Sequence, residues 1–242
     1  MEKIIIYDFD GTLTPYPTTN YEIMKKCGIE ESDGSDKFLN KVMDLRKNHN
    51  EDNYSSYLHA YLYFLNENNL EANLENIGLG ASDLTLNNGV QEYLEYTNSK
   101  GIKNYLLSSG IKHYLEQTII ANLFKEVYGS TFKFDDNGIA YDVEYALTDV
   151  LKVESIKEIL RKNNIDETDC SNVMYVGDGL TDMYAFEYVK EHGGEAVLVY
   201  NDNTEDIASE IKMKDIITFM SPSDYSLEEE LVTYIKRVFN IE

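Results

Sequence analysis

The chain has 242 residues, of which 43% are hydrophobic, and its 44 acidic and 21 basic side chains give a formal net charge of −23 at pH 7. This length allows one large domain, or one domain with a smaller insert. A surface with this excess of negative charge repels nucleic acids and anionic membranes. We therefore expect neither as a partner.

The cysteines and apolar runs give no sign of secretion or of a membrane span. Cys27 and Cys170 lie far apart, without the spacing of a zinc site or a disulfide framework. The apolar run near the N-terminus is too short for a signal-peptide core, and no run reaches the ~18 apolar residues of a transmembrane helix. We therefore expect a cytoplasmic protein.

Two carboxylates follow the first predicted strand. The run Ile-Ile-Ile-Tyr at 4–7 predicts a buried strand, which stops at Asp8 and Asp10 with only Phe9 between them. The same Asp-Phe-Asp-Gly could open a calcium-binding loop, but the twelfth position is Thr19 instead of Glu, and a strand precedes the loop. We therefore disfavour a calcium site.

Residues 18–86 predict a run of helices, after Pro15 and Pro17 interrupt the chain. In "NYSSYLHAYLYFLNE", apolar and tyrosine side chains recur at the period of one helix face. We expect the tyrosines of this face to belong to the core of the helical block and not to a substrate platform; they are Tyr54, Tyr57 and Tyr61. Arg46 is expected at the surface, and no role is assigned to any histidine.

From Gly89 onward, predicted helices and short strands alternate. Helices are expected over 90–99, 111–121, 152–162, 183–191 and 227–239; strands over 102–110, 172–179 and 196–200; and a hairpin over 130–144 that turns at Asn137-Gly138. Short apolar strands that alternate with helices indicate a parallel sheet covered on both faces. The helical block at 18–86 is then an insert between the first and second strands.

Polar side chains follow the ends of several of these strands, where parallel α/β sheets bind their ligands. They are Asp8, Asp10, Ser108, Asp178 and Asp182, with Lys152 at the start of a helix. Taken singly, Asp178 could be a turn residue and Ser108 a helix N-cap, but their placement at successive strand ends favours a shared site. Clustered carboxylates need a cation, for which Mg²⁺ is suited, while a lysine, a hydroxyl and helix-start amides suit a phosphate. Mg²⁺ and phosphate beside a free carboxylate indicate phosphoryl transfer through an aspartyl phosphate.

Four ordered segments carry a resemblance to a known family. "DFDGTLT", "LLSSG", Lys152 before a helix, and "GDGLTD" resemble the motifs of the haloacid dehalogenase-like hydrolases. The helical block lies where this superfamily inserts its cap, and together with the hairpin it looks most like the phosphoserine-phosphatase-like branch. The resemblance implies an α/β fold with a Rossmann-like three-layer core and parallel sheet at 1–14 and 87–242, and a helical cap domain at 15–86.

The resemblance also implies a role for each site residue. Asp8 would be the nucleophile and Asp10 the general acid and base. Ser108, Ser109 and Lys152 would bind the phosphoryl group. Mg²⁺ would be held by the Asp8 carboxylate, the Asp10 backbone carbonyl and Asp178, with Asp182 supporting that set.

The leading prediction is a Mg²⁺-dependent phosphatase that acts on a small phosphorylated metabolite. A phosphotransferase or mutase using the same intermediate, and a non-catalytic phosphate-binding protein, remain alternatives; a dehalogenase is disfavoured because its reaction needs no Mg²⁺. One position departs from phosphoserine phosphatases, which carry a substrate-reading acid shortly after the first motif, where this chain has Pro17. Phosphoserine is therefore not the expected preferred substrate, and the oligomeric state is left open.

Overall fold

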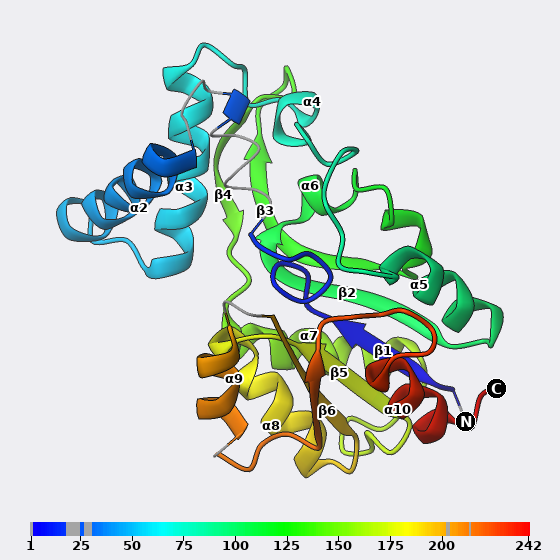
Figure 1. Ribbon diagram of the computed structural model, residues 1–242. Coiled ribbons are helices and arrows are strands. Elements are labelled where there is room, and N and C mark those ends of the chain that lie inside the picture. The colour runs from blue at the N-terminus through cyan, green and yellow to red at the C-terminus, as the bar shows by residue number, and fades with distance from the viewer. Residues whose placement is uncertain (1, 18–24, 27–30, 202–203, 213) are drawn as a thin grey trace.

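A computed structural model describes residues 2–17, 25–26, 31–201, 204–212 and 214–242 (Figure 1). The parts of the predicted helical run 18–86 that fall at 18–24 and 27–30, with Cys27, lie outside the described residues. Among the described helices, none combines the length and the apolar character that a membrane span requires.

The core of the molecule is a seven-stranded sheet with the order β4-β3-β2-β1-β5-β6-β7. Its strands are β1 (Ile4–Tyr7), β2 (Lys103–Ile111), β3 (Val127–Phe134), β4 (Ala140–Tyr145), β5 (Val173–Gly177), β6 (Glu195–Tyr200) and β7 (Phe219–Pro222). Neighbouring strands run parallel, except that β4 is antiparallel to β3. The chain builds outward from β1 on one side and then from β5 on the other, so the order of the strands reverses at β1, the position where such sheets bind ligands.

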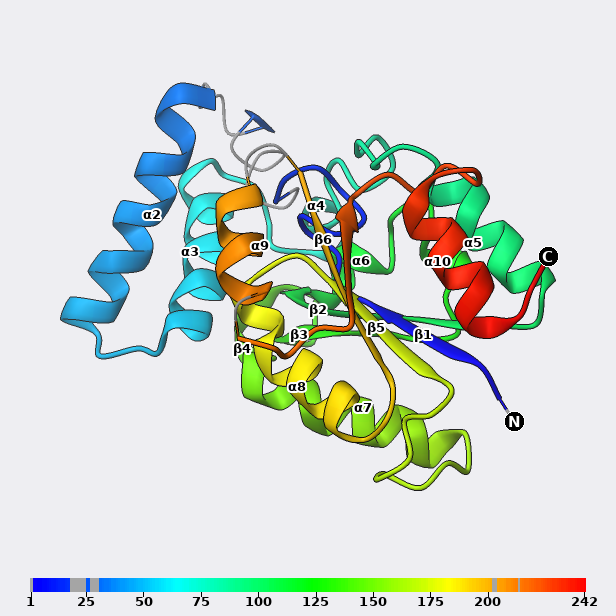
Figure 2. The same ribbon diagram turned by 60° about the horizontal axis from the view of Figure 1, so that its bottom comes forward.

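Helices cover both faces of the sheet, which confirms the expected three-layer core (Figure 2). Side chains alternate along β1, so Ile5 and Tyr7 belong to one apolar cluster and Ile4 and Ile6 to the other, all fully buried. The first cluster includes α5 (Val90–Ser99) and α10 (Glu230–Phe239); the second includes α7 (Asp149–Lys162), α8 (Met183–Glu191) and α9 (Glu205–Lys212).

Two helices lie beside β4, the outermost strand on one side of the sheet: α2 (Glu31–Asn48) and α3 (Asn53–Glu67), hereafter the helical pair (Figure 1). The carboxylate of Asp52 caps α3 by accepting hydrogen bonds from the backbone N–H groups of Tyr54 and Ser55 at 2.8 and 3.0 Å. Tyr61 of α3 is buried and its hydroxyl donates to the carbonyl of Ile77 at 2.8 Å. The expectation of a core role is therefore confirmed for this tyrosine. Arg46 is exposed, as expected.

The hairpin of β3 and β4 connects the sheet to the helical pair. It turns through Gly138, whose φ of +78° favours glycine, as the Asn-Gly sequence predicted. The ring of Phe132 in β3 stacks on Tyr61 of α3 with ring centroids 6.4 Å apart. The N–H of Ala140 also donates to the carbonyl of Ala72, which precedes the short helix α4 (Leu74–Ile77).

Several predicted elements are wrong in extent. The helix expected over 111–121 is a single turn, α6 (Lys112–Leu115), followed by a short 3₁₀ turn, η1 (Ala121–Leu123). The Thr118 hydroxyl donates to the Leu115 carbonyl and so competes with the backbone for the bond that would continue α6. Helix α7 starts earlier than predicted because Thr148 caps it, α10 starts later, and α9 and β7 were not predicted.

Candidate active site

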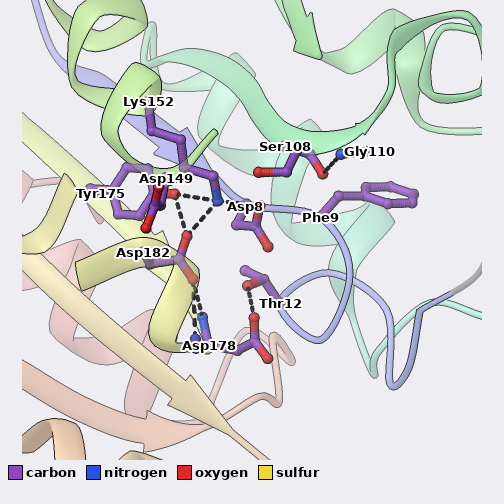
Figure 3. Close-up of polar contacts among 12 residues, drawn as sticks. Asp8, Phe9, Thr12, Ser108, Gly110, Asp149, Lys152, Tyr175, Asp178 and Asp182 are labelled. Carbon is purple, nitrogen blue, oxygen red and sulfur yellow. Dashed lines mark hydrogen bonds and ion pairs between the residues drawn. The ribbon is translucent and has the colours of Figure 1, made fainter. Parts of the chain in front are cut away.

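The first predicted acid lies at the centre of the strand ends. Asp8 follows β1 directly, and its N–H donates to the Val176 carbonyl of β5 at 2.9 Å, which extends the strand pairing by one residue. Because β1 lies between β2 and β5, the side chains of Asp8, Ser108 and Asp178 meet at one edge of the sheet (Figure 3).

A buried ammonium group lies against two of the carboxylates (Figure 3). Lys152, in the first half of α7, is fully buried, and its Nζ donates to Asp8 Oδ1 at 2.8 Å and to Asp182 Oδ1 at 2.7 Å. Burial alone would lower the pKa of Lys152, but the charges of Asp182 and Asp8 raise it well above its ordinary value. The lysine is therefore held in its charged form between the two acids.

Asp182 serves as an anchor for this ammonium group and for the turn after β5. Its Oδ1 accepts from Lys152 and from the Tyr175 hydroxyl at 2.6 Å, while Oδ2 accepts from the N–H groups of Asp178 and Gly179 at 3.2 and 3.1 Å. A Cβ on Gly177 would lie 2.6 Å from the Asp182 carboxyl carbon, so only glycine allows this approach. Tyr175 was missed because a tyrosine within an apolar strand is indistinguishable in sequence from a core residue.

Three carboxylates form a group that fits a divalent cation. Asp8, Asp178 and Asp182 each offer an oxygen, and these oxygens lie within 4.8 Å of one another. Burial raises the pKa of Asp8 to about 7, Lys152 opposes this, and the charges of Asp182 and Asp10 add to it. Burial, with the charges of Asp182 and Asp8, also raises the pKa of Asp178 well above its ordinary value. Both shifts show that these carboxylates are costly to ionise without a compensating cation, and hard oxygen ligands of this kind suit Mg²⁺.

Asp10 approaches the site from a different side. It does not belong to the group of three carboxylates found among the described residues. A Cβ placed on Gly110 would lie 3.7 Å from Asp10 Oδ2 and 3.3 Å from Ser108 Oγ, so both side chains border the space beside Gly110. The Gly110 N–H donates to Ser108 Oγ at 3.1 Å. The Ser109 hydroxyl is buried and makes no hydrogen bond with the described residues.

The loop after β1 is fixed by side chains that sequence reasoning missed. Thr12 Oγ1 donates to Asp178 Oδ1 at 3.3 Å, and the Thr12 carbonyl accepts from Asn87 Nδ2 at 2.8 Å and from the Tyr225 hydroxyl at 3.2 Å. Asn87 and Tyr225 are 75 and 213 residues away from Thr12 in the chain, so no local sequence pattern predicts these contacts. Together they hold the loop that carries Asp10 against the turn that carries Asp178.

A cavity of about 500 Å³ opens between the strand ends and the helical pair. The predicted residues Asp8, Asp10, Ser108, Ser109, Lys152 and Asp178 line its inner end; Leu39 and Val42 of α2 and Asn53, Tyr54 and Tyr57 of α3 line the other. The core role expected for Tyr54 is therefore wrong: it lies on the first turn of α3, and its hydroxyl accepts from the Asp149 N–H at 3.1 Å. Tyr57 lines the cavity while also packing edge-on against Phe38.

The fold and the site together define an α/β protein whose acids, hydroxyls and buried ammonium group meet beyond the carboxyl ends of its central strands. The sequence profile of the haloacid dehalogenase-like hydrolases matches residues 5–187, and the chain belongs to this family. No curated protein matches the chain.

Solved structures of similar fold include two of phosphoserine phosphatase. A phospho-aspartyl intermediate analogue of that enzyme is 20% identical, with a TM-score of 0.66 over 96% of this chain and 98% of the other. A substrate-bound complex is 19% identical, with a TM-score of 0.65 over 97% and 98%. A predicted phosphatase from Clostridium acetobutylicum is 15% identical, with a TM-score of 0.58 over 98% and 99%. The fold expected from the phosphoserine-phosphatase-like branch is thus confirmed.

Proposed function

We propose that the protein is a Mg²⁺-dependent phosphatase that hydrolyses a small phosphomonoester through an aspartyl phosphate on Asp8. The observation that carries this proposal is the Asp8 carboxylate, held by a buried Lys152 beside Ser108 and Asp178 at the inner end of a cavity. The names of the two phosphoserine phosphatase structures, one with bound substrate, support a small phosphorylated substrate.

In the first step, a carboxylate oxygen of Asp8 forms a bond to phosphorus while the bond to the ester oxygen breaks. Lys152 fixes the rotation of the Asp8 carboxylate through its 2.8 Å hydrogen bond and offsets negative charge as the phosphoryl group approaches. The hydroxyls of Ser108 and Ser109 donate to phosphoryl oxygens. Asp10 donates a proton to the departing alcohol.

In the second step, Asp10 takes a proton from water, which attacks phosphorus and releases inorganic phosphate and the free Asp8 carboxylate. Asp8, Asp178 and the Asp10 carbonyl would hold Mg²⁺, while Asp182 holds Lys152 and the turn of Asp178 in place. When bound, Mg²⁺ would neutralise the carboxylate group and polarise the phosphoryl oxygens.

We also propose a division of the chain into a core of residues 1–14 and 87–242 and a cap of residues 15–86. The cap would close the cavity over the leaving group and keep bulk water out during the first step. The cavity wall formed by the helical pair supports this division.

The test is turnover of p-nitrophenyl phosphate with Mg²⁺, after addition of excess EDTA, and again after Mg²⁺ is restored. We expect turnover with Mg²⁺, loss of turnover in EDTA, and recovery when Mg²⁺ is restored. Asp8→Asn should show no turnover under any of these conditions. Equal yields of phosphate and alcohol in the presence of glycerol would support hydrolysis; a deficit of phosphate would indicate transfer to an acceptor. Full turnover in EDTA would overturn the metal assignment, and no turnover at all would indicate a binding protein.

A further inference from the structure

The cavity wall opposite the phosphate end is uncharged among the described residues that line it. From the helical pair these are Leu39, Val42, Asn53, Tyr54 and Tyr57, and from the loop after β1 the wall includes Pro17. The carboxylates and the ammonium group that line the cavity all lie at its inner end.

Large apolar side chains are exposed on both sides of this cavity. Leu39 of α2 is 51% exposed, and Leu180, just after β5, is 48% exposed, and both line the cavity. A single exposed leucine is ordinary on a protein surface. Two that face one cavity, next to two tyrosines, form an apolar binding surface.

Among the described residues of the helical pair that line this wall, none is cationic, so none offers a positive charge to a substrate carboxylate. The helix start of α3 faces the cavity through Asn53 and Tyr54, but the N–H groups of Tyr54 and Ser55 are already bound by the Asp52 carboxylate. Lys41 of α2 is paired with Asp44 and lies over the ring of Tyr63, and it does not line the cavity.

We propose that this wall binds the leaving group of the substrate, and that the leaving group is an uncharged alcohol with an apolar or aromatic body. This inference rests on the proposed phosphatase function. A carboxylate or ammonium group placed against Leu39 and Val42 would lose part of its hydration without gaining a partner of opposite charge. A ring or branched alkyl group there is stabilised by the apolar surface it buries.

The test compares substrates whose alcohols are all primary. We expect kcat/KM for benzyl phosphate and isoamyl phosphate to exceed that for phosphoserine and phosphoethanolamine by at least about tenfold, or ~1.4 kcal/mol. Equal or better turnover of either charged ester would overturn the proposal. If p-nitrophenyl phosphate is not hydrolysed either, the proposed function fails, and the binding test below decides the nature of the wall separately.

Binding is measured by calorimetry with Mg²⁺ and two phosphonates that cannot be hydrolysed. 2-Phenylethylphosphonate matches benzyl phosphate in shape, and 2-amino-4-phosphonobutanoate matches phosphoserine. We expect the first to bind at least about tenfold more tightly. The reverse order, or equal affinity, would overturn the proposal whether or not the protein is a phosphatase.

A pair of variants tests the wall itself. Leu39→Asp should weaken the binding of 2-phenylethylphosphonate about tenfold. The affinity for inorganic phosphate, measured by calorimetry or as inhibition, should not change. Met43→Asp is the matched control, because Met43 is 45% exposed on the same helix and does not line the cavity. An unchanged ratio of the two phosphonate affinities in Leu39→Asp would show that this wall does not read the leaving group.

Discussion

The proposed role of Asp8 requires an ionised carboxylate, but its surroundings favour the protonated form. As a nucleophile it must be ionised, yet burial and the neighbouring acids raise its pKa to about 7. Lys152 offsets part of this, and a divalent cation bound to the same carboxylates would offset the rest.

The two acids are expected to fail in different ways when replaced. Asp8→Asn replaces the attacking carboxylate anion with a neutral amide, so no phosphoenzyme forms. Asp10→Asn keeps the nucleophile but loses the proton donor and the base for water, which is typically worth about 10²–10⁴-fold in rate. Because an aryl oxide leaves without a proton, the Asp10→Asn deficit should be smaller in the first step for p-nitrophenyl phosphate than for an alkyl phosphate.

Rapid-quench trapping of labelled phosphoenzyme separates the two roles. Asp10→Asn should accumulate it with the aryl ester, since water is no longer activated. Labelled phosphoenzyme in Asp8→Asn, or equal Asp10→Asn deficits for aryl and alkyl esters without accumulation, would show that the two roles are wrongly assigned.

Gly11 makes the approach of the first motif to Asp178 possible. Its φ is +81°, and a Cβ there would lie 2.1 Å from Asp178 Oδ2. Gly11→Ala should therefore displace the Asp178 carboxylate and lower Mg²⁺-dependent activity by at least about 10²-fold, the scale expected when a catalytic group is misplaced by about 1 Å. Gly101→Ala is the matched control, because its φ is +76° and a Cβ would meet no atom within 4 Å. Thermal unfolding should show the cost of the left-handed backbone in both variants and a further loss in Gly11→Ala from the overlap with Asp178. Similar activity in both variants would contradict this role for Gly11.

At the scale of elements, the sequence predicted those whose signals are local. Helices α3, α5 and α8 and the β3–β4 hairpin follow from apolar period, caps and the Asn-Gly turn. The structure of residues 111–121 could not be predicted in this way. Strand β2 continues to Ile111 because it pairs with Ser130 of β3, which is a contact between distant segments. The same holds for the candidate site: motif order predicted that Asp8 and Lys152 act together, whereas the contacts of the Tyr175 hydroxyl with Lys152 and Asp182 depend on the tertiary fold.

A histidine without an assigned role joins the helical pair to the hairpin. His59 of α3 contacts Glu51 Oε2 through Nδ1 at 2.8 Å and Asp142 Oδ1 of β4 through Nε2 at 3.1 Å; Lys133 pairs with the other Asp142 oxygen at 2.7 Å. Partial burial would lower the pKa of His59, but its hydrogen bonds to these two carboxylates and their charges raise it above its ordinary value.

A raised folded-state pKa means that His59 stabilises the fold fully below its unfolded pKa of about 6.5, and that this stability is lost as pH rises through the folded pKa. His59→Gln should therefore lower Tm by about 1–4 °C at pH 5.5 and by less at pH 9, since partly exposed pairs of this kind are worth about 1 kcal/mol or less. His49→Gln, at an exposed position, is the control. A larger loss at pH 9 than at pH 5.5 would contradict the ion-pair account.

At the scale of the whole molecule, the net charge of −23 affects any experiment with a divalent cation. The excess surface carboxylates repel one another, which destabilises the compact folded state. Added salt screens this repulsion and so stabilises the fold. Stabilisation by Mg²⁺ is therefore not by itself evidence of a specific site, and a variant with nearly the same surface charge is needed to separate the two effects.

Asp178→Asn supplies that variant, because it changes the net charge by only one. In the wild type, Mg²⁺ at about 100 times its Kd should stabilise the folded state by ~2.7 kcal/mol, or roughly 5–10 °C in Tm for a chain of this length. Sodium chloride at matched ionic strength gives the screening contribution alone. Because the pKa of Asp178 is raised by burial and by Asp182 and Asp8, its ionised form costs folding free energy near neutral pH. Asp178→Asn should therefore melt at a higher temperature than the wild type without Mg²⁺, and should lose the part of the Mg²⁺ shift that exceeds the salt control. Differential scanning calorimetry measures both, and an undiminished Mg²⁺ shift in the variant would show that the bound cation is not held by Asp178.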